Sequence, residues 1–160
     1  MKPLGLLLKL PLETSTALKT LFTRDLNKLK AELELYRNEK NIWLVEKNIA
    51  NSAGNLCLHL VGNLNAYLGA EIGGTGYIRN RDLEFSLKDI PRAELISMVE
   101  ATITVVNNAL DLLTEEDLQK EYPLLVFPQK TSTEYFLVHL ASHLAYHLGQ
   151  INYHRRLLDV

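Results

Sequence analysis

The sequence has 160 residues, of which 47% are hydrophobic and 22% charged, and its formal net charge is −2. This length and composition predict one globular domain over residues 1–160. The balanced charge gives no support for a strongly basic face, and no apolar run reaches the roughly 18 residues of a membrane span, so we expect neither nucleic acid nor membrane as a partner.

The N-terminus, M-K-P-L-G-L-L-L-K-L-P, is rich in leucine. Pro3, Gly5 and Pro11 interrupt the run, and no small-residue cleavage site follows it, so it does not read as a secretory signal. The single cysteine, Cys57, rules out an intramolecular disulfide and fits a reducing compartment. We therefore expect a cytoplasmic protein in which Cys57 is a small buried residue rather than a nucleophile.

Apolar residues recur at three- and four-residue intervals over four long segments, which predicts four amphipathic helices. They cover about residues 14–38, 49–68, 92–113 and 131–158. Asn51 or Ser52 could cap the second helix, and Thr131 with Glu134 has the pattern of a capping box at the start of the last. The pattern predicts an all-α four-helix bundle with a short irregular segment before the last helix.

The last helix carries three evenly spaced histidines, His139, His143 and His147. Neighbours four residues apart are offset by about 40° and 6 Å, so His143 and His147 can point at one ion. His139 and His147 differ by about 80° and 12 Å, so one ion cannot take all three from a straight helix. His154 faces the same way as His143 but lies too far along the axis. A lone pair at this spacing is also compatible with histidines that hydrogen bonds satisfy.

The remaining histidine, His59, lies in the middle of the second predicted helix. Its apolar neighbours suggest burial, so it is either a core histidine that donates to a carbonyl or a third ligand that projects toward His143 and His147. The sequence has neither H-E-x-x-H nor E-x-x-H, which removes the main support for zincin and di-iron sites. Three imidazoles with an open position would form a reactive metal site.

His59 in the second helix and H-L-A-Y-H-L-G-Q at residues 143–150 resemble the DinB-like superfamily of metal-dependent bacterial four-helix proteins. The segments 51–63 and 79–85 are similar to a poorly characterised branch of it. The resemblance implies that His59, His143 and His147 share a divalent ion, zinc or nickel. It also implies a homodimer and, for some relatives, activation of a low-molecular-weight thiol for transfer to an electrophilic small-molecule substrate.

Two further activities stay open: metal-dependent hydrolysis by bound water, and a non-catalytic bundle with a structural metal or none. The loop R-N-R-D-L-E-F at residues 79–85 follows a glycine-rich turn. Its Arg79 and Arg81 could hold an anionic substrate or thiol, or its charges could pair with each other. Asn63 and Gln150, each one turn from a predicted ligand, could orient it or link helices. We expect only a supporting role for His139.

Overall fold

The structure is a computed structural model that describes residues 13–46 and 48–160. Within these residues the secondary structure is helical apart from one isolated β-bridge, which confirms the prediction of an all-helical protein. The elements are α1 (Thr14–Glu34), the 3₁₀-helix η1 (Glu39–Trp43), α2 (Ala53–Leu64), the π-helix η2 (Asn65–Ala70), α3 (Arg81–Ser86), α4 (Arg92–Asp111), α5 (Glu115–Gln119) and α6 (Thr133–Leu158). No described helix has the length and apolar character needed to cross a membrane. The leucine-rich N-terminal run lies outside the described residues.

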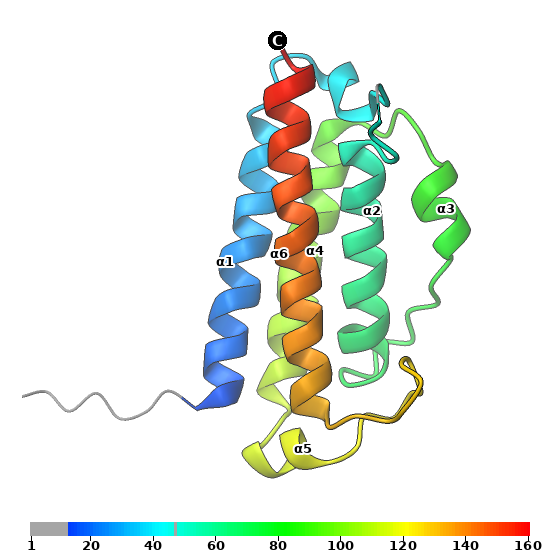
Figure 1. Cartoon of the computed structure of the whole chain (residues 1–160). Coiled ribbons are helices and arrows are strands. Elements are labelled where there is room, and N and C mark those ends of the chain that lie inside the picture. The colour runs from blue at the N-terminus through cyan, green and yellow to red at the C-terminus, as the bar shows by residue number, and fades with distance from the viewer. Residues whose placement is uncertain (1–12, 47) are drawn as a thin grey trace, which may run out of the picture.

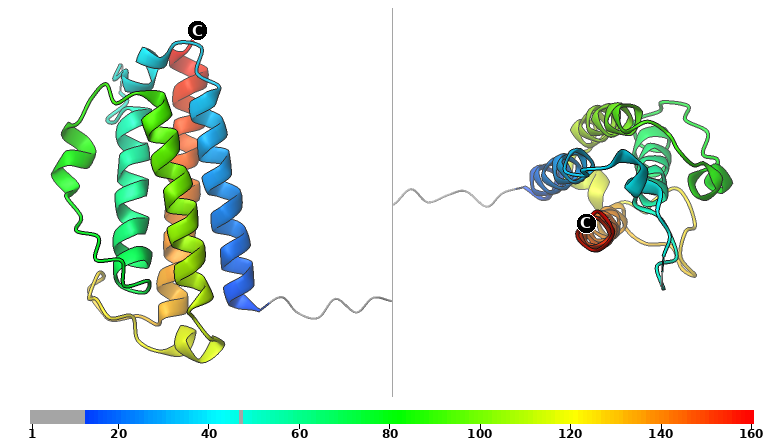
Figure 2. Two further views of the ribbon diagram at one scale, coloured as in Figure 1. Left: turned by 180° about the vertical axis from the view of Figure 1, so that it is seen from behind. Right: turned by 90° about the horizontal axis from the view of Figure 1, so that it is seen from above.

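The four longest helices, α1, α2, α4 and α6, run side by side, with α2 prolonged by η2 (Figures 1 and 2). Helix α6 packs against both α1 and α2, and α4 does the same on the other side. The short helix α3 lies outside α2, and α5 lies at one end of the four (Figure 1). The four predicted helical segments are therefore present, with α1 ending at Glu34 rather than near residue 38.

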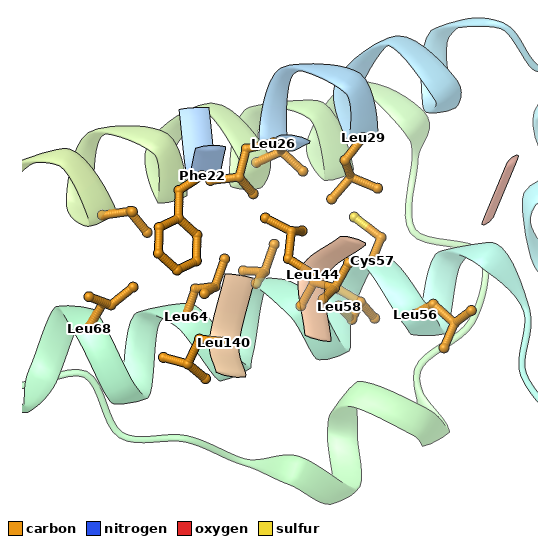
Figure 3. Close-up of a cluster of buried hydrophobic side chains, with 14 of the residues drawn as sticks. Phe22, Leu26, Leu29, Leu56, Cys57, Leu58, Leu64, Leu68, Leu140 and Leu144 are labelled. Atoms are coloured by element: carbon orange, nitrogen blue, oxygen red, sulfur yellow. The ribbon is translucent and has the colours of Figure 1, made fainter. Parts of the chain in front are cut away.

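The core follows the sequence periodicity of the helices. On α1 the buried side chains recur every three or four residues: Leu18, Phe22, Leu26, Leu29 and Leu33. These side chains meet those of α2 and α6 between the helices, where Cys57 also lies (Figure 3). Cys57 is fully buried, and burial raises the pKa of its thiol to about 12, which supports the prediction that it is no nucleophile.

Helix α2 is covered along its whole length, because every residue from Ala53 to Leu64 is buried. The outer cover comes from α3 and from the Trp43 ring, which lies so close to Gly54 that a Cβ there would overlap it. The Ser52 side chain caps α2 by accepting a hydrogen bond from the Asn55 backbone N–H. Polar side chains on this helix, His59 among them, are therefore buried.

The start of α6 differs from the predicted capping box. Ser132, not Thr131, is the cap, and its hydroxyl accepts from the Tyr135 backbone N–H at 3.2 Å. The Thr131 carbonyl instead accepts from the Tyr122 N–H at 2.9 Å, as part of the bridge between Glu121 and Ser132. This bridge keeps Thr131 extended, so the helix begins after it. The segment between α5 and α6 is otherwise irregular, as predicted.

The end of α2 widens into the π-helix η2, which the apolar pattern does not predict. Asn65 explains part of this, since its side-chain amide donates to the Val61 carbonyl at 2.8 Å and to Thr102 on α4 at 2.9 Å. The chain then turns away through Gly74 and Gly76, whose φ angles of 63° and 72° suit glycine. This turn sends residues 77–91 back along the outside of α2 and places α3 against His59.

Candidate metal centre

The ε nitrogens of three histidines converge between α2 and α6. His143 Nε2 lies 3.1 Å from His59 Nε2 and 3.1 Å from His147 Nε2. One ligand atom of each histidine lies within 4.8 Å of the others. Two nitrogens bound about 2.1 Å from one ion at angles between 90° and 109° are about 3.0–3.4 Å apart. The spacing therefore fits three imidazoles around one metal ion.

Glu84 fixes the orientation of His59. Glu84 Oε2 lies 2.9 Å from His59 Nδ1, and Arg79 pairs with the same carboxylate through Nε at 2.7 Å and Nη2 at 2.9 Å. A carboxylate paired with arginine is ionised and can only accept, so His59 Nδ1 carries the proton. His59 Nε2 then presents its lone pair to the other two histidines. This carboxylate–histidine arrangement is typical of metal ligands.

Gln150, one turn after His147 on α6, orients the His147 ring as Glu84 orients that of His59. Its side-chain oxygen lies 2.7 Å from His147 Nδ1, which therefore donates to it. His147 Nε2 is thus left with a lone pair directed at His143, as His59 Nε2 is.

His143 lies between these two acceptors. Its single Nε2 can carry at most one proton, so hydrogen bonding could satisfy only one of the two lone pairs that face it. Its Nδ1 is buried and has no partner among the described residues. Burial, with repulsion from His147, His59 and His139, lowers the pKa of His143 to about 4, so the imidazole is neutral at pH 7. Burial also lowers the pKa of His59. Neutral imidazoles are the form that binds a metal.

Gly62 makes room for the carboxylate of Glu84. It lies three residues after His59 on the same face of α2, and a Cβ at this position would overlap Glu84 Oε1. Asn80 caps α3, since its side chain accepts from the Leu83 backbone N–H at 3.3 Å, and this places Glu84 on the side facing α2. Asn55 Nδ2 ties down the end of α3 by donating to the Glu84 and Leu87 carbonyls, each at 2.9 Å.

A cavity of about 270 Å³ adjoins two of the three histidines, His59 and His143. Its walls include His59 and His143 together with the predicted supporting residues Asn63, Arg79, Arg81 and His139. Arg79 is largely used in the pair with Glu84, which is the internal pairing that the sequence left open, whereas the Arg81 guanidinium lies over the Phe85 ring at 6.0 Å. Of the predicted supporting residues, only Gln150 lies away from this cavity.

The remaining two histidines, His139 and His154, lie outside the converging group. His139 is exposed at the cavity wall, with its ring edge-on to Phe127 at 4.8 Å, and it does not join the three converging nitrogens. His154 is buried near the far end of α6 against Tyr36. Both placements agree with the angular argument from the sequence, which left a single pair on this helix.

Glu84 is the main residue that the sequence analysis did not assign to the site. In the sequence it is one of the charges of the loop at residues 79–85. A helix signal was present, since Asn80 is a good cap and acidic Asp82 and Glu84 follow it. Nothing in the local sequence, however, shows that this short helix folds back onto His59.

Comparison with known proteins gives one relationship. No curated protein and no solved structure shows a significant match to the chain. A family described as "Protein of unknown function (DUF1572)" matches residues 16–159, which includes all three histidines, Glu84 and Gln150. The chain belongs to this DUF1572 family.

Proposed function

We propose that this protein is a DinB-like four-helix bundle of one domain that binds a divalent metal ion through His59, His143 and His147. The ion would be zinc or nickel, both of which suit imidazole ligands. The proposed activity is that of a metal-dependent enzyme that activates a small thiol for transfer to an electrophilic small molecule.

One observation carries the metal proposal. His59 and His147 each donate their δ proton to a fixed oxygen, on Glu84 and Gln150 respectively, so both ε lone pairs face His143. Without an ion, two lone pairs compete for one proton, in a site where burial disfavours an added charge. A bound cation satisfies all three nitrogens together. The arrangement is costly without an ion and favourable with one.

The chemistry follows from having three protein ligands rather than four. Among the described residues, no fourth histidine, cysteine or carboxylate side chain joins the three histidines, so a ligand position is left for a thiol or water. A bound ion would lower the pKa of the thiol, whose proton leaves to solvent. The thiolate sulfur would then form a C–S bond to the electrophilic carbon, while the bond from that carbon to its leaving group breaks and the leaving group departs with the electron pair. His59 and His147, held by Glu84 and Gln150, would keep the open position fixed during this step.

The first test is metal binding. Purified metal-free protein should take up one equivalent of zinc or nickel, and X-ray absorption should show three imidazole nitrogens in the first coordination shell. Uptake that survives replacement of both His143 and His147 by alanine would contradict the proposal.

The second test separates the thiol reaction from hydrolysis by bound water. The metal-loaded protein is assayed against a panel of electrophiles and esters, with and without added low-molecular-weight thiols. Turnover that requires the thiol and is absent from the His143→Ala variant supports thiol transfer. Turnover without thiol supports the hydrolase. A fourth protein nitrogen, oxygen or sulfur ligand in the absorption spectrum would instead support a structural metal.

We also propose a homodimer that forms through α6. One face of this helix exposes apolar or aromatic side chains along its length: Tyr135, Val138, Tyr146, Tyr153 and Leu157. Antiparallel pairing of two copies would bring Glu134 at the start of one α6 toward Arg156 at the end of the other, which gives opposite charges at both ends. Tyr146→Glu should convert the dimer to a monomer in sedimentation analysis.

The lone buried cysteine fits the proposed cytoplasmic location.

A further inference from the structure

The cavity beside the three histidines contains a buried polar group without a protein partner. Asn63 is only 7% exposed and lines the cavity, and its Oδ1 accepts no hydrogen bond from the described residues. An unsatisfied buried amide oxygen costs about 1–3 kcal/mol, so an acceptor of this kind normally has a partner. This oxygen is itself inaccessible, so the Asn63 side chain must rotate for it to accept from an N–H or O–H of a molecule bound in the cavity.

The same cavity also has one guanidinium, that of Arg81, whose charge no carboxylate of the described residues neutralises. Arg79 lines the cavity, but its charge is neutralised by Glu84, with which it makes a bidentate ion pair at 2.7 and 2.9 Å. Arg81 also lines the cavity, and its guanidinium lies over the Phe85 ring at 6.0 Å and pairs with no carboxylate of the described residues. A guanidinium presents its donors in one plane, which suits a planar carboxylate.

We propose that this cavity is a subsite for a small carboxylate ligand that also bears an N–H or O–H donor. Arg81 binds the carboxylate, and Asn63 accepts from the donor. The inference rests on the proposed function in one respect, since it makes this ligand the part of the thiol that lies away from the sulfur. One free guanidinium matches one negative charge, and about 270 Å³ holds only a small molecule.

The test uses three related thiols as probes. N-acetylcysteine has the carboxylate and the amide N–H, N-acetylcysteamine lacks only the carboxylate, and 3-mercaptopropionate lacks only the amide. Binding to the metal-free protein is measured by calorimetry, and binding to the cobalt-loaded protein by its thiolate charge-transfer band. We expect N-acetylcysteine to bind most tightly in both forms, by about tenfold or more over each of the other two.

Two variants assign the contacts. Arg81→Gln should weaken N-acetylcysteine by about tenfold or more and leave N-acetylcysteamine unchanged, because only the former has the carboxylate. Arg37→Gln is the matched control, since Arg37 is exposed, does not line the cavity, and its loss changes the net charge equally. Asn63→Leu removes the orphan oxygen at similar volume and should abolish the preference for N-acetylcysteine over 3-mercaptopropionate.

The outcomes separate this subsite from the metal proposal. If metal-free protein discriminates the probes but binds no metal, the subsite stands and the metal proposal fails. If metal binds but the three probes bind equally, or if Arg37→Gln weakens N-acetylcysteine as much as Arg81→Gln does, the subsite is wrong and the metal proposal stands.

Discussion

Helix α6 places histidines in two buried environments with opposite properties. At its C-terminal end His154, 3% exposed, uses both ring nitrogens within the protein: Nδ1 accepts from the Tyr36 hydroxyl at 2.7 Å, and Nε2 donates to the Leu44 carbonyl at 2.8 Å. In the middle of the helix, His143 Nε2 faces two other imidazole nitrogens and its Nδ1 has no partner among the described residues. One region is chemically closed and the other is open.

The difference shows what separates a structural histidine from a candidate ligand here. Burial does not, because burial lowers the pKa of both His143 and His154. Position on the helix does not either, since the two residues share a face. The distinction lies in what the second nitrogen contacts. At His154 it contacts a backbone carbonyl, whereas at His59 and His147 a fixed oxygen holds one nitrogen and leaves the other free to bind.

The largest effect expected from this comparison is on metal affinity in the open region. His143→Ala removes the central ligand and should lower metal affinity by more than about a hundredfold, beyond the range typical of supporting residues. Metal content after dialysis against a competing chelator measures it. The matched control is His139→Ala, one turn earlier on the same helix, which should retain metal. Equal loss in both variants would show that His143 is no more a ligand than His139.

The next effect concerns the residue that orients His59. Glu84→Gln keeps the shape of the side chain but loses the charge that fixes the His59 proton and pairs with Arg79, so metal affinity should fall about 10–100-fold. Asp82→Asn, on the same short helix but exposed, makes the same change in charge and should have no effect. Chelator competition with both variants provides the measurement. Equal affinities would show that Glu84 only pins the loop.

The closed region should respond in stability instead. Tyr36→Phe removes the hydroxyl that donates to His154 Nδ1 and leaves that nitrogen buried without a partner, at a cost of about 1–3 kcal/mol in the free energy of unfolding. Urea unfolding measures this cost, and metal affinity should not change. A Tyr36→Phe protein that lost metal as readily as His143→Ala would erase the distinction between the two regions.

The smallest effect is a pH dependence of stability that belongs to His154. Burial holds its pKa below the ordinary 6.5, so unfolding takes up a proton in acid. Its contribution to stability is therefore intact above about pH 6.5 and is lost as the pH falls below that, by at most about 1.4 kcal/mol per unit.

This slope is isolated by comparing unfolding free energies of metal-free wild type and His154→Gln between pH 5 and 7. The wild type should lose more stability toward pH 5, because only it has this histidine to protonate. Parallel curves would show that His154 does not titrate in this way. Both proteins share His59 and His143, so their contributions cancel in the difference.

The sequence predicted the parts of this molecule that depend on helical periodicity. Four long helices, their buried faces and the separation of His139 and His154 from the pair at His143 and His147 follow from repeats of 3.6 residues. The meeting of His59 with that pair came from a family resemblance, because spacing along one helix cannot show what another helix brings to it. The structure places the three nitrogens together.

The helical periodicity of the sequence does not predict two features of the structure, the π-helix η2 and the contact of Glu84 with His59. The π-helix after α2 depends on Asn65 bonding both its own helix and Thr102, which is a contact between distant residues. The role of Glu84 depends on the fold of residues 71–91 over the outside of α2. In both, the deciding interaction joins segments at least 20 residues apart, and local pattern contains no information about such partners.

The absent side chain at Gly62 links two processes that would otherwise be independent. Because the Glu84 carboxylate occupies the space where a Cβ would be, the docking of α3 and the alignment of His59 are one event. Each kilocalorie by which an ion favours the aligned imidazole must also favour the docked segment. Metal loading should thus slow amide hydrogen exchange in α3, a helix that contributes none of the three histidines, and any partner that pulls α3 away would release the ion.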